Sequence, residues 1–299
     1  MKRLRRFAAI LTGAAAALAV VTPAASAAPL DLPHGMTASY LALDQATGHT
    51  FGRGEHKQYR SASVVKLFIA LDYLEAHGPG YQIPAGDLNL LRPMLRSSDD
   101  DAASALWKRD GRQEIVNRTV ALIGLTDTAP PQTSAWGDTA ISAADIVKTY
   151  RYILHRANPK YRDFIMGNLH KATRCASDGF DQSFGIPSAV GESPYAVKQG
   201  WDGFGDAPAP GQECKSQDPH TQRVLNSPEV RAAARLASSG DDGIDLTSRA
   251  MHTTGTVGPH DRTIVVVLTL EPTTTTWQES AERITRLTRY VYRHTILDD

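Results

Sequence analysis

The stretch Ser63-Val64-Val65-Lys66 decides how the rest of the chain is interpreted. It opens an apolar segment, Ser63 to Ala76, which predicts a buried helix. On a helix, a serine and a lysine three positions apart lie on one face, so their side chains can meet. A lysine held in a dry pocket can lose its proton and activate the hydroxyl. The pair therefore predicts Ser63 as a nucleophile and Lys66 as its base.

Two short motifs follow, in an order that fits acyl-transfer chemistry. Ser98-Asp99-Asp100 precedes a helical pattern, and Lys198-Gln199-Gly200 lies on a predicted strand, 196–201. Acyl transfer needs a nucleophile, a base, a proton path to the leaving group and an oxyanion hole. Ser98 can shuttle the proton, and Lys198 supplies positive charge for a substrate carboxylate. The backbone N–H groups of Ser63 and Trp201 would form the oxyanion hole.

Each motif also has an explanation without catalysis. Ser98 can be a helix N-cap followed by acidic residues in the first turn. Lys198 can be an ordinary exposed lysine on a strand, and Trp201 can be a packing residue or part of a cleft wall. A Ser-x-x-Lys match by itself arises by chance. The order and context of the motifs favour the catalytic interpretation.

The three motifs together resemble the S-x-x-K, S-D-N and K-T-G elements of the penicillin-recognising serine enzymes. The second continues as Asp101-Ala102-Ala103-Ser104-Ala105-Leu106, similar to the T-A-A-N-L-L of class A β-lactamases. The resemblance covers most of the chain. It implies an α+β, β-lactamase-like fold, with an antiparallel sheet, flanking terminal helices, an all-α lobe and an active site between the lobes. The implied catalytic residues are Ser63, Lys66 and Ser98; the implied substrate-binding residues are Asp100, Lys198, Gln199, Gly200 and Trp201.

Three departures from the family pattern bear on activity. Asp100 stands where the family has Asn; a carboxylate only accepts hydrogen bonds and favours the charged form of Lys66. Gln199 replaces Thr or Ser, so a hydroxyl contact to a substrate carboxylate is lost. The stretch Asp127 to Ser142, which corresponds to the Ω-loop, holds no glutamate to activate a deacylating water. The sequence therefore predicts an acylation site without fast β-lactam hydrolysis.

Three functions remain open at this point. The first is a secreted serine hydrolase or acyl-transferase that forms a Ser63 acyl-enzyme with a cell-wall peptide or a related amide or ester. The second is a catalytically decayed binding or regulatory protein on the same fold, which Asp100 and Gln199 favour. The third is a true β-lactamase. The expected partner is a peptidoglycan-type peptide or a β-lactam-like small molecule, and the expected state is a monomer.

No cofactor or metal is expected. The ten histidines show neither H-x-H nor H-E-x-x-H spacing. The chain has 32 Lys+Arg and 32 Asp+Glu. Four of the basic residues precede position 7, so the remainder carries a formal charge of −4. This charge argues against a nucleic-acid partner, which would require a basic surface.

The N-terminus has the pattern of a secretory signal peptide. Its basic start is followed by the apolar run Phe7 to Val21 and by Ala25-Ser26-Ala27, an A-x-A site. We expect cleavage after Ala27 and a secreted, extracellular protein with no transmembrane segment in the mature chain. No cysteine follows this site directly, so no lipid anchor is expected there.

The mature chain, 28–299, is expected to form one β-lactamase-like domain. Its α/β lobe would cover 36–75 and 185–299, and its helical lobe 76–184. Strands are expected at 37–48, 49–54, 196–201, 249–257 and 262–271, and a closing helix at 279–296.

A long excursion, 202–248, is expected between two strands, with a short helix at 229–237. Cys175 and Cys214 are the only cysteines in the chain. In an exported protein such a pair predicts a disulfide, which would tie this excursion beside the third motif.

Overall fold

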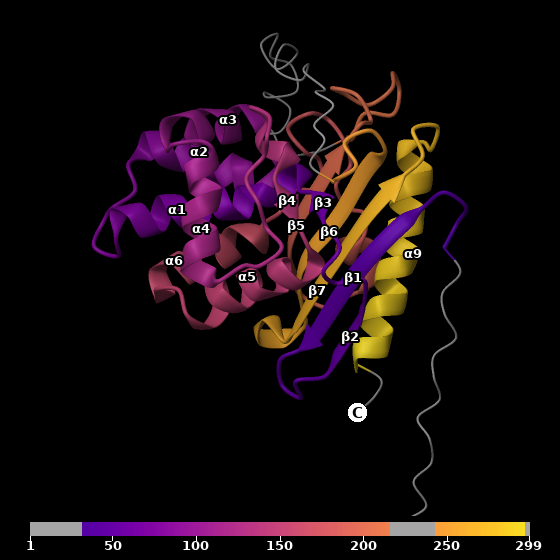
Figure 1. The fold of residues 1–299 in the computed structure, drawn as a ribbon, viewed down its shortest axis with the longest axis horizontal. Helices are drawn as coiled ribbons and strands as arrows, with labels where there is room; N and C mark the ends of the chain where they lie inside the picture. The colour runs from indigo at the N-terminus through magenta and orange to yellow at the C-terminus, as the bar shows by residue number, and fades with distance from the viewer. Residues whose placement is uncertain (1–31, 216–242, 297–299) are drawn as a thin grey trace, which may run out of the picture. The chain divides into compact units, whose positions relative to one another are not determined.

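The computed structural model describes residues 32–215 and 243–296. The expected signal peptide and the helix expected at 229–237 lie outside the described residues. Within the described part, a five-stranded sheet has helices packed on both of its faces (Figure 1). The helices α1 to α6 lie to one side of the sheet, and the long C-terminal helix α9 covers the other.

The sheet has the strand order β2-β1-β7-β6-β5, and all neighbouring strands are antiparallel. All nine residues of β7 are buried, as expected for a central strand that is covered on both faces. The antiparallel sheet and its α+β class confirm the predicted fold. The strands are β1 Thr37–Asp44, β2 Thr50–Arg53, β5 Tyr195–Asp202, β6 Arg249–Val257 and β7 Thr263–Glu271.

The helices follow the apolar periodicity of the sequence. Ser142 caps α5 by accepting a hydrogen bond from the Asp145 N–H at 3.1 Å, as its capping pattern predicts. Helix α9 is amphipathic and buries Ile284, Leu287 and Val291 against the sheet. The helices are α1 Lys66–His77, α2 Ala85–Arg96, α3 Asp100–Arg109, α4 Gln113–Ile123, α5 Ala143–His155, α6 Pro159–Leu169, α7 Ile186–Ala189 and α9 Trp277–Ile296.

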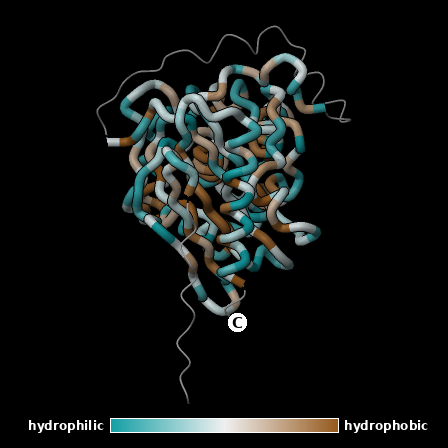
Figure 2. Tube along the Cα trace, turned by 90° about the vertical axis from the view of Figure 1, so that its right-hand side faces the viewer, coloured by the Kyte–Doolittle hydropathy of each residue, from teal (hydrophilic) through white to brown (hydrophobic). Residues whose placement is uncertain are grey.

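Helix α1 is the buried axis of the helical layer. It contacts α2, α3, α4 and α6, which explains why its residues are apolar nearly all round. Leu67, Phe68 and Leu71 have no exposed surface. Figure 2 shows hydrophobic segments running through the interior, with hydrophilic segments outside. Any polar side chain that α1 carries into this interior needs a partner there.

A second, two-stranded sheet was not predicted. It pairs β3, Tyr59–Arg60, with β4, Ala140–Ile141. These strands are too short to show a sequence period. Their pairing brings the end of the 127–142 stretch beside the short 3₁₀ helix η1, Ala62–Val65, which leads into α1.

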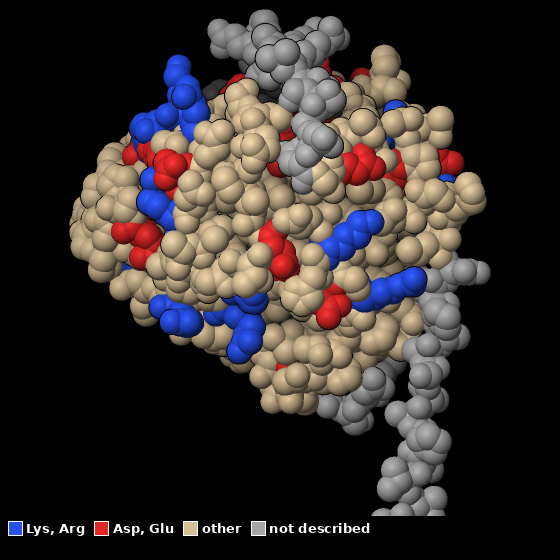
Figure 3. Space-filling model, in the orientation of Figure 1, with Lys and Arg blue, Asp and Glu red and all other residues tan. Residues whose placement is uncertain are grey.

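The surface carries both signs of charge. On the face drawn in Figure 3, lysines and arginines are interspersed with aspartates and glutamates, so this face has no extended patch of one sign. Among residues 32–215 and 243–296, no helix is long and apolar enough to cross a membrane.

Candidate active site

Ser63 and Lys66 meet at the junction of η1 and α1. Lys66 is the first residue of α1, and its side chain has no exposed surface. Its Nζ donates a hydrogen bond to Ser63 Oγ at 2.7 Å. Ala62, which directly precedes Ser63, has φ 44°, in the left-handed region that L-residues rarely adopt. Strained backbone beside a buried hydroxyl–amine pair is typical of a functional site.

Ser98 joins this pair from the loop between α2 and α3. Its carbonyl accepts a hydrogen bond from Lys66 Nζ at 2.7 Å, and its Oγ lies 3.3 Å from the same nitrogen. Its φ is 58°, again left-handed. The N-cap of α3 is Asp99, whose carboxylate accepts from the Ala102 N–H at 2.8 Å. The alternative that Ser98 merely caps the helix is therefore wrong.

Lys198 reaches the same serine from β5. It is only 1% exposed, so the alternative of an ordinary exposed lysine is wrong. Its Nζ lies 2.7 Å from Ser98 Oγ and donates to the Gln199 carbonyl at 3.1 Å. Burial, together with the nearby Lys66 charge, lowers the pKa of Lys198 well below its ordinary value. The hydrogen bonds form one continuous chain, Ser63–Lys66–Ser98–Lys198.

Asp100 adds a negative charge to this chain. Its Oδ1 accepts a hydrogen bond from Lys66 Nζ at 2.5 Å. The Asp100 side chain is 57% exposed, whereas the lysine is fully buried. One partner of the ion pair is thus open to solvent. As the sequence predicts for this position, the carboxylate can only accept hydrogen bonds, and it accepts one from Lys66.

Trp136, which was not predicted as a site residue, covers Lys66. Its ring centroid lies 4.7 Å from Lys66 Nζ, a cation–π contact. The Trp136 indole N–H donates to Ser104 Oγ at 3.1 Å. It lies in the 127–142 stretch, whose carboxylates are occupied elsewhere: Asp127 accepts from Ser142 Oγ at 2.8 Å, and Asp138 accepts from Thr133 Oγ1 at 2.6 Å.

Gly200 lets β5 pass directly beside Ser63. This strand ends the five-stranded sheet and contacts η1. A Cβ on Gly200 would lie 3.0 Å from the Ser61 carbonyl oxygen and 3.3 Å from the Ser63 backbone nitrogen. Only glycine permits this approach. The backbone of β5 therefore lies close to the Ser63 backbone nitrogen. We still expect the N–H groups of Ser63 and Trp201 to form the oxyanion hole.

Gln199 is turned away from this cluster. Its amide nitrogen donates to the carbonyls of Gln182 at 3.0 Å and Phe184 at 2.6 Å, and the residue is 1% exposed. The prediction that Gln199 binds substrate is not supported by this placement. The amide instead fixes the loop before α7 to β5.

The Trp201 side chain also contacts the loop before α7, through a hydrogen bond and through ring packing. Its indole N–H donates to Asp178 Oδ2 at 3.0 Å, and its ring packs edge-to-face against Phe184 and Trp277. The loop is also tied by the predicted disulfide, which is confirmed: Cys175 and Cys214 are bonded, with Cα atoms 5.4 Å apart.

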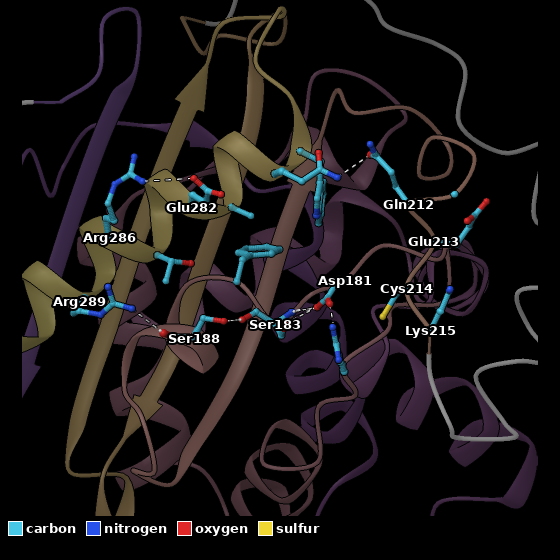
Figure 4. Close-up of a pocket in the computed structure, with 17 residues that line it drawn as sticks. Asp181, Ser183, Ser188, Gln212, Glu213, Cys214, Lys215, Glu282, Arg286 and Arg289 are labelled. Atoms are coloured by element: carbon cyan, nitrogen blue, oxygen red, sulfur yellow. Dashed lines mark hydrogen bonds and ion pairs between the residues drawn. The ribbon is translucent and has the colours of Figure 1, made fainter.

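A separate pocket of about 900 Å³ lies between α9 and this disulfide-bonded loop (Figure 4). Charged side chains such as Asp181, Arg286 and Arg289 surround it, and Phe184 and Trp277 line it. None of the residues in the hydrogen-bonded chain at Ser63 contributes to its lining. In the described parts of the chain, no cluster of three His, Cys, Asp or Glu side chains could hold a metal.

The arrangement of sheet and helices matches solved structures. PBP-A superposes with a TM-score of 0.60 at 16% sequence identity, over 88% of this chain and 91% of PBP-A. A β-lactamase from Sphaerobacter thermophilus gives 0.61 at 16% identity, over 88% and 93%. A class A β-lactamase from Mycobacterium abscessus gives 0.59 at 18%, over 87% and 94%. The chain has the β-lactamase fold. This confirms the resemblance that the three motifs carry, at the level of fold.

Sequence relatives add a second comparison. "Putative lipoprotein LppW" from Mycobacterium tuberculosis is 39% identical over 171 residues, which are 56% of this β-lactamase-fold chain. The same protein from Mycobacterium bovis matches equally. The match covers 54% of these relatives, so the chain spans about half the length of the curated relatives it matches. No family model matches the chain.

Proposed function

We propose that this protein is a serine hydrolase or acyl-transferase that forms an acyl-enzyme at Ser63. The observation that carries the proposal is the fully buried Lys66 amine, 2.7 Å from Ser63 Oγ and linked through Ser98 to Lys198. A nucleophile hydrogen-bonded to a base, which a further group orients, is the arrangement that nucleophilic catalysis requires. The fold it shares with PBP-A and class A β-lactamases supports this proposal.

The proton transfers can follow the hydrogen-bonded chain. Lys66 Nζ contacts the Asp100 carboxylate, whereas Lys198 is the amine whose pKa burial lowers. Lys66 can give a proton to Ser98 Oγ while Ser98 passes its own proton to Lys198. The neutral Lys66 amine then takes the proton of Ser63 as its Oγ attacks the substrate carbonyl.

The leaving group is protonated on the Ser98 side. When the tetrahedral intermediate collapses, Ser98 gives its proton to the leaving nitrogen or oxygen and is reprotonated by Lys198. The acyl group stays on Ser63 Oγ until water or another nucleophile attacks it. Because the 127–142 stretch holds no glutamate, we propose slow release of the acyl group or its transfer to an amine acceptor.

The substrate we propose is a cell-wall peptide or a related amide or ester, met outside the cytoplasm. A mutant of PBP-A forms an acyl-enzyme complex with penicillin G, which makes β-lactams suitable probes. The disulfide supports an oxidising compartment. The relatives' designation as a lipoprotein points to the same side of the membrane.

Mass spectrometry of the intact protein tests the proposal. Incubation with benzylpenicillin should add one acyl group to the wild type and none to Ser63→Ala. A correctly folded wild type that stays unmodified, does not consume the drug and also fails to react with the methyl ester of benzylpenicillin and with a fluorophosphonate would overturn the proposal. Consumption of the drug without a trapped adduct would favour the third function, a β-lactamase.

A second candidate is a decayed enzyme that only binds its ligand. Two observations favour it. Lys66 is paired with Asp100 at 2.5 Å, where the family has an Asn, and the Gln199 amide turns inward, where the family has a Thr or Ser hydroxyl. Ligand binding that is unchanged in Ser63→Ala, with no adduct in the wild type, would support this function instead.

A further inference from the structure

A fixed carboxylate, Asp178, lies next to the proton relay. The backbone N–H of Ser177 donates to the Ser97 carbonyl at 2.8 Å, and the hydroxyls of these two serines are 2.9 Å apart. Ser98 directly follows Ser97 in the chain, and Asp178 directly follows Ser177. The pairing brings the segment that carries Asp178 to that of Ser98, and the Asp178 charge acts on Lys198, which hydrogen-bonds to Ser98 Oγ.

Both oxygens of this carboxylate are held in place. Oδ1 accepts from the Phe180 N–H at 3.1 Å, and Oδ2 accepts from the Trp201 indole at 3.0 Å. Trp201 is itself packed against Phe184 and Trp277. The disulfide and the hydrogen bond from the Cys214 N–H to the Gly179 carbonyl at 2.9 Å anchor the loop. A preorganised group of this kind keeps its position when a substrate enters.

Among the described residues, the charges with the largest effect on Asp178 are those of Asp100 on α3 and Lys66 on α1, and Asp178 in turn acts on Lys198 on β5. Burial, and next the Asp100 charge, raise the pKa of Asp178 to about 7. Above this pH, the region next to Ser98 carries the Asp178 charge. The buried Lys198, whose pKa is lowered, contributes less positive charge than a lysine normally would.

We propose that Asp178 determines the leaving group: it rejects leaving groups with a carboxylate and accepts those that are uncharged or carry an amine. This inference rests on the proposed Ser63 acyl-enzyme. Two carboxylates facing each other in a partly buried site repel, whereas an ammonium or amide N–H finds an acceptor. The substrate class is then an internal amide or an ester, and not a peptide ending in a free carboxylate next to the scissile bond.

Benzylpenicillin and its methyl ester test this, because they differ only in a carboxylate on the leaving-group side. Rates of Ser63 acylation are followed by intact mass at pH 6 and pH 8. The wild type should prefer the ester about tenfold at pH 8, and less at pH 6, where Asp178 is protonated. Asp178→Asn should abolish this preference and its pH dependence. Asp163→Asn, an exposed aspartate on α6, removes the same charge elsewhere and should behave as wild type.

The outcomes separate the two proposals. Labelling of Ser63 with equal rates for acid and ester, or with the ester preference intact in a folded Asp178→Asn, overturns the role of Asp178 and leaves the acyl-enzyme standing. If Asp178→Asn does not fold, the wild type decides: an acid-to-ester ratio that is constant between pH 6 and pH 8 overturns the inference. No labelling of the wild type by penicillin, its ester or a fluorophosphonate overturns the acyl-enzyme, and this inference with it.

Discussion

Lys66 Nζ lies closer to the Asp100 carboxylate, at 2.5 Å, than to Ser63 Oγ, at 2.7 Å. The lysine that we propose as the base for Ser63 is thus paired with an exposed acid. We expect this ion pair to control how readily Ser63 can be activated.

Asp100→Asn should therefore accelerate acylation of Ser63. The amide keeps an oxygen to accept from Lys66 but removes the charge that favours the ammonium. We expect an increase of about tenfold at pH 7, because no carboxylate then opposes the proton transfer from Lys66 that precedes attack by Ser63. Stopped reactions analysed by intact mass give the rate.

The control for this variant is Asp101→Asn, which removes the next acid in the same helical turn. It should leave the rate within about twofold of wild type, since Lys66 pairs with Asp100. If Asp100→Asn is no faster than Asp101→Asn, the ion pair does not limit activation.

Gly200→Ala should disable the site by moving β5 away from Ser63. The added Cβ would lie 3.0 Å from both the Ser61 carbonyl oxygen and Val64 Cγ2. Overpacking of this kind costs about 1–3 kcal/mol of unfolding free energy. Acylation should fall more than about tenfold, because a displaced oxyanion donor loses its alignment.

The control is Gly86→Ala on α2, where an added Cβ meets nothing within 4 Å. This variant should keep the wild-type rate and be at least as stable as the wild type. Equal rates in the two variants would show that the close approach is dispensable.

Much of the fold was predictable because its signals are local. Three elements could be predicted from their own residues alone: β7 from its apolar run, α5 from its capping serine and α9 from its apolar face. Ser63, Lys66, Ser98 and Lys198 were recognisable because the motifs are short and ordered.

The remaining site residues depend on contacts between distant segments. Trp136 covers Lys66 because the loop that carries it precedes β4, which pairs with β3, and two-residue strands leave no pattern. Asp178 reaches the site through the pairing of Ser177 with Ser97. The inward turn of Gln199 depends on two carbonyls of the loop at 182–184, which the sequence around Gln199 does not reveal.

Removing the disulfide should weaken the loop that carries Asp178. Cys175 and Cys214 are 39 positions apart, and a bond across such a loop stabilises by about 4 kcal/mol in the chain-entropy estimate. The double variant Cys175→Ser/Cys214→Ser should lose a large part of this in urea unfolding. It should also reduce the ester preference, because Asp178 is less well fixed. An unchanged unfolding midpoint would contradict the prediction.

Buried His252 should make stability fall on acidification. It is fully buried, it is bonded to the Arg60 carbonyl at 2.8 Å, and burial lowers its pKa to about 4. Between pH 6.5 and pH 4 the unfolded chain binds this proton and the native state does not, so native stability decreases as pH falls. Asp178, with its raised pKa, has the opposite effect in the same range, so the slope of the wild type alone does not isolate His252.

The contribution of His252 is isolated by comparison with His252→Gln. The difference in unfolding free energy, wild type minus variant, should fall by about 2 kcal/mol between pH 7 and pH 5. A difference that stays constant over this range would mean that His252 is protonated in the native state at pH 5.

The sheet register has a consequence for how the protein folds. The central strand β7 pairs with β1, so that Ala38 lies opposite Thr269, more than two hundred residues along the chain. The sheet cannot close around β1 until β7 has been synthesised, and loops of this length are slow to close. Folding should therefore be slow and largely post-translational, with the β7-facing edge of β1 unpaired in the growing chain and in need of protection from aggregation until the last strands arrive.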